Sequence, residues 1–216
     1  RYNVLRAVGY YKGKPVAEDL IVFKGLEQAP NFELLYQDDK KILKGEAGYN
    51  YLYRLNCGGD DYTDSFGQLW LQDNTNYSHS WAENFKDLNP YLASQRTTND
   101  PIRGTRDWKL FQHFRFGRHQ LEYRFPVADG TYRIELYFTE PWHGTGGSAS
   151  TDCEGLRIFD VAVNDSVVLD DLDIWAESGH DEVCKKVIYA TVTGGMLRIH
   201  FPEVKAGQGL ISGIAI

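Results

Sequence analysis

Short apolar runs separated by glycine-bearing turns dominate the second half of the chain, most clearly in Leu110–Gly147. There, two runs rich in aromatic residues flank the turn signal Ala128-Asp129-Gly130, a pattern typical of a β-hairpin. The second run ends at Glu140-Pro141-Trp142-His143, and four glycines follow between Gly144 and Gly155. We therefore expect a hairpin that presents a tryptophan beside a glycine-rich loop, a surface suited to a flat, polar, non-ionic ligand such as a sugar.

Further runs predict an all-β domain with roughly eight strands and no convincing amphipathic helix. A second hairpin is expected around Gly194-Gly195. Between Tyr62 and Thr105 no period is visible, so we expect a long irregular segment packed by its own aromatic side chains. The remaining expected strands are Tyr49–Asn56, Arg157–Val163, Val167–Leu169, Lys186–Thr193, Met196–Pro202 and Leu210–Ile216.

The beginning of the chain reads as a separate unit. Asn3–Tyr11 and Val16–Phe23 flank a glycine turn and predict a hairpin, and Asn31–Gln37 predicts a third strand. Three strands are marginal alone, so we expect residues 1–38 to be the last strands of a β domain and the chain to be part of a longer protein. The charged segment 39–48 reads as a linker, and residues 49–216 form the main domain.

Charge and cysteine content narrow the classes of partner. The net charge of −7 argues against nucleic acid, and no apolar run approaches the length of about 18 residues that a membrane span needs. The three cysteines, Cys57, Cys153 and Cys184, show no zinc-type spacing. One disulfide with a free thiol and three buried thiols both remain open.

Acidic residues give two weaker signals. Asp170, Asp171 and Asp173 form a local cluster without a calcium-loop pattern, which favours a solvated turn and leaves a structural Ca²⁺ as the alternative; no other cofactor or metal is expected. Glycoside hydrolysis needs two carboxylates roughly 5–9 Å apart, and Glu140 could be paired with Asp152 or Asp173. Many such pairs could be drawn, and no nucleophile-elbow, zinc or P-loop signature is present, so we favour a binding module over a catalyst.

Five segments, taken in order, resemble malectin-like domains, which are β-sandwich modules that bind di-glucose and related glycans. The resemblance covers about Tyr49–Ile216 and implies an all-β, malectin-like sandwich of the jelly-roll type with a carbohydrate-binding role. The segments are Tyr53–Gly59, Ile134–Glu140, Arg157–Val163, Asp170–Ile174 and Ile211–Ile216.

A second resemblance concerns the parent protein. Residues 1–38 look like the last strands of an immunoglobulin-like domain near the C-terminus of glycoside hydrolase family 2 enzymes of the β-galactosidase type. The pattern SWAENF…PYLASQR…DPIRGT…LFQHFRFGRH, within Ser80–His119, is similar to the malectin-type tails of those enzymes. This implies a bacterial, periplasmic or extracellular glycosidase acting on β-galactosides or related glycans, with its catalytic domain upstream. The alternative is a structural or oligomerisation module of the same enzyme, with a possible homodimer.

The malectin resemblance also implies a set of sugar-binding residues. Trp142 keeps the first of two aromatics that follow the family's Phe-x-Glu strand end, and His143 replaces the second. Phe116 stands where the family has a tyrosine, and Gln208 lies where it has an aspartate; Tyr91 is the candidate in the irregular region. Rings would stack on sugar C–H faces while polar groups bond hydroxyls. Packing roles for Trp142 at the sandwich end and for Phe116 in the core are the alternatives.

Overall fold

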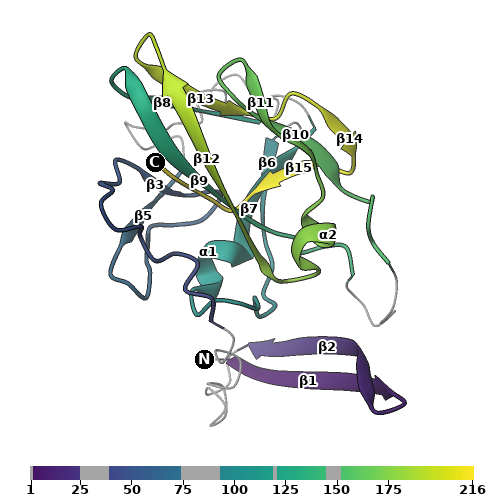
Figure 1. Ribbon diagram of the computed structural model, residues 1–216. Helices are drawn as coiled ribbons and strands as arrows, with labels where there is room; N and C mark the ends of the chain where they lie inside the picture. The colour runs from purple at the N-terminus through teal and green to yellow at the C-terminus, as the bar shows by residue number, and fades with distance from the viewer. Residues whose placement is uncertain (1, 25–38, 74–92, 119–120, 145–151) are drawn as a thin grey trace.

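The computed structural model describes residues 2–24, 39–73, 93–118, 121–144 and 152–216 (Figure 1). Within these ranges nearly all regular structure is β-strand, as expected, and the strands build a β-sandwich. Tyr91 and the expected strand Asn31–Gln37 lie outside the described residues. In the part of the chain that is described, no helix is long and apolar enough to cross a bilayer.

The two main layers are a six-stranded and a five-stranded sheet. The six-stranded sheet has the order β12-β9-β16-β3-β5-β4, and the five-stranded sheet has the order β11-β10-β13-β8, with β14 also paired to β10. The first comprises β3 (Arg54–Asn56), β4 (Tyr62–Thr63), β5 (Leu69–Gln72), β9 (Gly130–Thr139), β12 (Val183–Val192) and β16 (Gly213–Ala215). The second comprises β8 (Glu122–Pro126), β10 (Ile158–Val163), β11 (Ser166–Leu172), β13 (Met196–His200) and β14 (Val204–Ala206).

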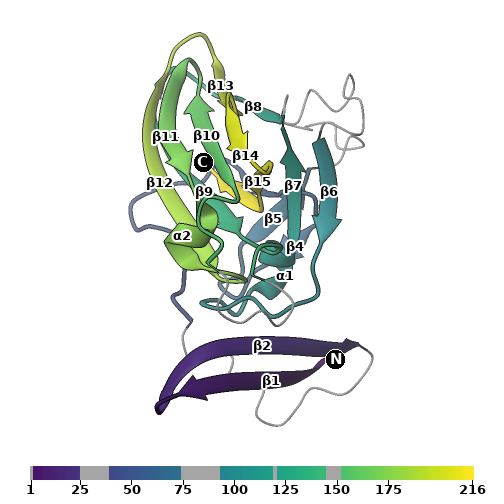
Figure 2. The same cartoon turned by 90° about the vertical axis from the view of Figure 1, so that its right-hand side faces the viewer.

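Smaller elements complete the fold. A three-stranded sheet, β15-β7-β6, stands beside the sandwich (Figure 2). Its strands are β6 (Ala93–Thr97), β7 (His113–Gly117) and β15 (Gly209–Ile211). The expected N-terminal hairpin is confirmed as β1 (Tyr2–Tyr11) and β2 (Lys14–Lys24), and two five-residue helices are α1 (Trp108–Gln112) and α2 (Ile174–Ser178).

Strand β9 is buried on both faces. A strand alternates its side chains between two sides, and a different apolar cluster packs on each side of β9. Leu136 and Phe138 enter the main core, where Phe138 meets Phe159 of the opposite sheet with ring centroids 6.2 Å apart. Tyr137 points the other way, into a second cluster with Trp70. The continuous apolar run that predicted a strand here therefore contributes side chains to two clusters, and residues of α1 pack in the second of them.

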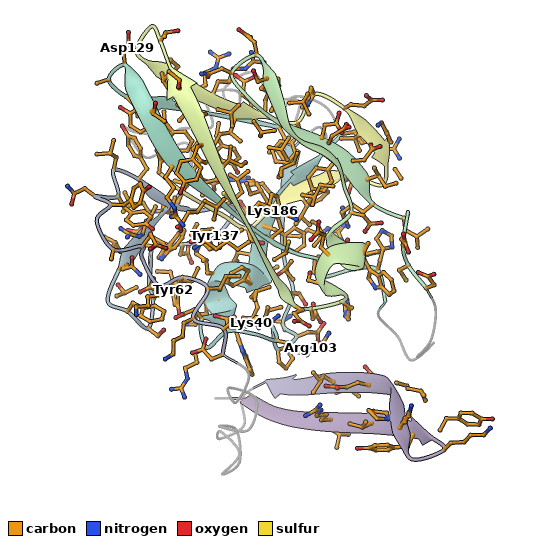
Figure 3. All side chains as sticks on the ribbon, viewed as in Figure 1. Lys40, Tyr62, Arg103, Asp129, Tyr137 and Lys186 are labelled. Carbon is orange, nitrogen blue, oxygen red and sulfur yellow. The ribbon has the colours of Figure 1, made fainter. Side chains whose placement is uncertain are left out.

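The two expected interior hairpins are wrong. β8 and β9 flank Ala128-Asp129 but belong to different sheets, as do β12 and β13 around Gly194-Gly195. Instead β8 pairs with β13, and β9 pairs with β12. Each of the two connections runs from one sheet to the other, and both lie at the same end of the sandwich (Figure 3). There, Gly195 N donates to Asp129 Oδ1 at 2.9 Å.

Other boundaries also differ from expectation. Of Tyr49–Asn56, only Arg54–Asn56 forms a strand, and the expected irregular segment Tyr62–Thr105 contains β4, β5 and β6. The closing run Leu210–Ile216 changes sheets at Ser212, whose N–H donates to the carbonyl of Tyr137 at 2.9 Å. A run that divides between two layers has the same apolar pattern as a single strand, so periodicity does not reveal the break.

The charged segment 39–48 packs on the domain. Leu43 is buried in the second cluster, and Lys40 N donates to the carbonyl of Gly104. Lys40 and Arg103, neighbours in Figure 3, both form ion pairs with Glu182. The division into residues 1–38, 39–48 and 49–216 stays a prediction.

Candidate functional site

A cavity of about 410 Å³ lies where the three-stranded sheet meets the loop that follows β9. It brings together four of the five expected site residues: Trp142, Phe116, His143 and Gln208. The fifth, Tyr91, lies outside the described residues. The complete lining is Arg96, Phe114, Phe116, Arg118, Pro141, Trp142, His143, Arg157, Gly207, Gln208 and Leu210.

Strand β7 supplies the aromatic floor. Phe114 and Phe116 are two residues apart and therefore share one face, with ring centroids 6.1 Å apart. Phe114 is buried in the core, whereas Phe116 is half-buried and lines the cavity. Arg115, between them, turns to the other side and forms an ion pair with buried Asp73 at 3.0 Å. Both rings line the cavity, Phe114 as a member of the core and Phe116 as a less buried ring packed against that core.

Trp142 forms a wall of the cavity. Its side chain is 59% exposed, which does not fit a ring that caps the sandwich end by burial. The guanidinium carbon of Arg96 lies 5.5 Å from the Trp142 ring centroid and 5.8 Å from that of Phe116. These distances are within the range of cation–π attraction, so Arg96 links the wall to the floor.

The loop that carries Trp142 is held from below by Glu140, the last residue before it. Glu140 is fully buried, and its Oε1 accepts hydrogen bonds from the backbone N–H of Trp142 at 2.9 Å and of His143 at 3.0 Å. Arg157 donates Nε to Oε2 at 2.5 Å and Nη2 to Oε1 at 3.2 Å. Burial disfavours the ionised carboxyl, but the hydrogen bonds and charge of Arg157 outweigh it and lower the pKa of Glu140. Glu140 is therefore a charged structural anchor.

The opposite side of the cavity is a turn held by two arginines. Arg157 Nη1 donates to the carbonyl of Gln208 at 2.7 Å, and Arg118 Nε donates to that of Gly207 at 2.9 Å. Gly207 has φ +64°, and a Cβ there would lie 2.8 Å from the carbonyl oxygen of Leu156, so the turn requires glycine. The Gln208 side chain is left exposed.

Sequence reasoning missed the three arginines of this cavity, Arg96, Arg118 and Arg157. The sequence held a signal for Arg157, because this residue directly precedes the apolar run that forms β10, and the structure shows that it is buried. A buried guanidinium needs a carboxylate partner, and Glu140 directly follows the apolar strand β9. Arg96 and Arg118 carry no such signal, because their role depends on which strands become neighbours.

A family model described as the malectin domain matches residues 51–215. The chain belongs to the malectin domain family. Malectin of Danio rerio is 24% identical over 178 residues, covering 80% of this chain and 56% of that protein. Malectin of Mus musculus is 26% identical over 149 residues, covering 68% of this chain and 45% of that protein. The chain thus spans about half the length of these relatives.

Two solved structures share the fold of this malectin-family chain. A Bacteroides uniformis β-glucuronidase aligns with a TM-score of 0.60 and 24% identity, over 100% of this chain and 22% of that one. The plant receptor-like kinase FER aligns with a TM-score of 0.57 and 18% identity, over 76% of this chain and 48% of that one. The malectin β-sandwich expected from the sequence is confirmed.

The acidic cluster of this malectin domain has a different membership from the one expected. Asp160, Asp170 and Asp171 bring carboxylate oxygens within 4.8 Å of one another. Asp173 instead caps α2, accepting from Ala176 N at 3.0 Å, and also accepts from Gly155 N at 2.6 Å. Lys205 pairs with Asp171 and supplies a positive charge to the cluster. The solvated turn expected at Asp170, Asp171 and Asp173, and its alternative, a structural Ca²⁺, both stay predictions.

None of the three cysteines in the described structure forms a disulfide, and all three are buried. Of the two alternatives that the sequence left open, the structure therefore has the three buried thiols. Burial raises the pKa of the Cys184 thiol to about 11 and also raises that of Cys57. The thiolate form is suppressed at neutral pH, which gives these residues a packing role.

Proposed function

We propose that this malectin domain binds an oligosaccharide in the cavity beside Trp142, as a non-catalytic accessory module of a larger glycoside hydrolase. The observation that carries the proposal is the convergence of an exposed Trp142 ring, the Phe116 ring and polar groups of His143 and Gln208 on one cavity. Sugars present C–H faces that stack on rings and hydroxyls that need a few placed polar partners. The family to which the chain belongs supports the same ligand class.

The parent enzyme is proposed to be a bacterial glycoside hydrolase of family 2 with its catalytic domain upstream. The alignment of the whole chain with 22% of a β-glucuronidase supports this arrangement. Its substrates would be β-galactosides or related glycans, and its location periplasmic or extracellular. Residues 1–38 would then be the last strands of an immunoglobulin-like domain.

Calorimetric titration of the chain with gluco- and galacto-oligosaccharides tests the site. We expect saturable binding in the wild type and its loss in Trp142→Ala. Absence of binding to every glycan, or unchanged binding in the variant, would overturn the assignment. In a full-length parent enzyme, removal of residues 49–216 is expected to lower activity on polymeric substrate more than on an aryl glycoside.

A structural or oligomerisation role is the second candidate, and the edge strand β12 favours it. Val187 and Tyr189 lie on one face of this strand and are 42% and 61% exposed. Exposed large side chains on a sheet edge can support self-association. Sedimentation velocity of the wild type and of Tyr189→Glu tests this: a dimer that dissociates in the variant supports it, and a monomer at high concentration excludes the homodimer.

A further inference from the structure

The cavity beside Trp142 differs in charge from the protein around it. The chain carries a net charge of −7. Its described cavity lining nevertheless includes Arg96, Arg118 and Arg157 and contains neither Asp nor Glu. A basic patch on an acidic protein creates a local potential that concentrates anions.

The three arginines are not equivalent. Arg157 is buried and compensated by Glu140, so it contributes little net charge to a ligand. Arg96 and Arg118 are exposed, and among the described contacts neither has a carboxylate partner. They therefore supply the excess positive charge at the cavity mouth.

The described contacts of these two side chains leave hydrogen-bonding capacity. Arg96 contacts the Trp142 and Phe116 rings through its charge, and cation–π attraction uses no N–H group. Arg118 donates Nε to the carbonyl of Gly207, and its two terminal nitrogens have no described acceptor. A guanidinium has five N–H donors in a planar fork that matches a carboxylate. Each arginine therefore retains donors for two oxygens of an anionic group.

We infer that the cavity recognises a sugar bearing an anionic substituent, a uronate carboxylate or a sulfate ester, with Arg96 and Arg118 as its charge partners. The inference rests on the proposed function and specifies the class of sugar. A pyranose that stacks on the Trp142 wall projects its substituents from the ring edge, and Arg96 lies 5.5 Å from that wall. A neutral hydroxyl gains one ordinary hydrogen bond there, whereas an anion gains charge-assisted, two-point contacts. The sequence predicted a non-ionic ligand, and this inference differs from that prediction.

Matched disaccharides test the inference. The 216-residue chain is titrated calorimetrically with a neutral glucose disaccharide, with its analogue in which the terminal hydroxymethyl group is a carboxylate, and with its sulfate ester. We expect one of the anionic sugars to bind about tenfold more tightly than the neutral one, since hydrogen bonds to charged groups are stronger. Which of the two binds better identifies the anion. The preference should shrink with added salt, because exposed charges are screened.

Variants assign the effect to the arginines. Arg118→Gln is expected to weaken the anionic sugar more than the neutral one, so that most of the anionic preference is lost, and Arg118→Lys to retain part of it. Arg96→Gln should weaken the anionic sugar more than the neutral one, because it removes the charge. It should also weaken the neutral sugar, because Arg96 contacts both rings of the site. Lys109→Gln, which removes an exposed charge on α1 outside the cavity lining, is the matched control and should change nothing.

The outcomes separate this inference from the function on which it rests. Equal binding of neutral and anionic sugars, or an anionic preference that persists in both arginine variants, overturns the inference and leaves sugar binding intact. Failure of every sugar to bind overturns both.

Discussion

The carboxylate of Glu140 and the guanidinium of Arg157 form a buried ion pair that joins the two sides of the cavity. Glu140 holds the backbone N–H groups of Trp142 and His143, while Arg157 holds the carbonyl of Gln208. These two side chains fix both loops through one contact. Glu140 therefore acts as a positioning residue for Trp142.

Replacing Glu140 by glutamine is expected to destabilise the fold. The amide oxygen can still accept the two backbone hydrogen bonds, but the buried charge of Arg157 loses its counter-ion. Removing one partner of a buried pair lowers the free energy of unfolding by about 3–5 kcal/mol. Urea unfolding followed by tryptophan fluorescence measures the change. Glu154→Gln, at an exposed site, is the control; a Glu140→Gln value equal to the control would contradict the anchor role.

The same pair predicts a pH dependence. The pKa of Glu140 is lowered in the folded state from an ordinary value of 4.5. A lowered folded pKa contributes stability that is fully present above the unfolded pKa and is lost as the pH falls through the folded pKa. The stability difference between wild type and Glu140→Gln should thus be constant from pH 7 to about 5 and shrink below 4.5. Urea unfolding across this range measures it, and a difference that grows with acid would be inconsistent with the lowered pKa.

Alanine variants at two similarly exposed rings can distinguish an effect on sugar binding from an effect on the free energy of unfolding. Trp142 is 59% exposed and Tyr189 is 61% exposed, on different parts of the sandwich. Trp142→Ala should weaken sugar binding about tenfold or more and change the free energy of unfolding by less than about 1 kcal/mol. Tyr189→Ala should leave both nearly unchanged. Calorimetry and urea unfolding of the two variants test this; equal affinities would remove Trp142 from the site.

The sequence predicted most strand positions but not how the strands pair. β9, β10, β12 and β13 all begin and end near the expected residues, because period and turn residues are local properties. Whether a turn makes a hairpin or crosses between layers depends on the partner strand. Asp129 and Gly195 show this: each marks a turn, and the two turns bond to each other instead of closing their own hairpins.

The candidate site was also predicted only where local sequence patterns carry the information. Trp142 and Phe116 could be identified because family motifs surround them, and the structure places both on one cavity. Arg96 and Arg118 come from separate segments that only sheet pairing joins, β6 against β7 and Arg118 directly after β7. Their contribution depends on contacts across the fold, which local patterns do not encode.

Asp73 is expected to be a second buried anchor, behind the floor strand β7. It is 1% exposed and accepts hydrogen bonds from Gly58 N at 2.9 Å, from Arg115, and from the Tyr123 hydroxyl at 3.0 Å. Asp73→Asn leaves Arg115 without its counter-charge, so the free energy of unfolding should fall by about 3 kcal/mol or more. Urea unfolding measures it, with exposed Asp165→Asn as the control. A loss no larger than the control's would show that Arg115 is compensated elsewhere.

The three thiols should be inert in the native state. Cys57, Cys153 and Cys184 are at most 6% exposed, and burial raises the pKa of Cys184 to about 11. Only the thiolate attacks a disulfide reagent, so burial opposes access at all three thiols, and the raised pKa opposes ionisation at Cys57 and Cys184. With an aromatic disulfide reagent at pH 8, we expect no labelling within minutes in buffer and three thiols per chain in urea. Ser166→Cys, at the exposed first residue of β11, provides the positive control and should react at once. Fast labelling of the wild type, or one thiol instead of three in urea, would contradict three buried cysteines without a disulfide.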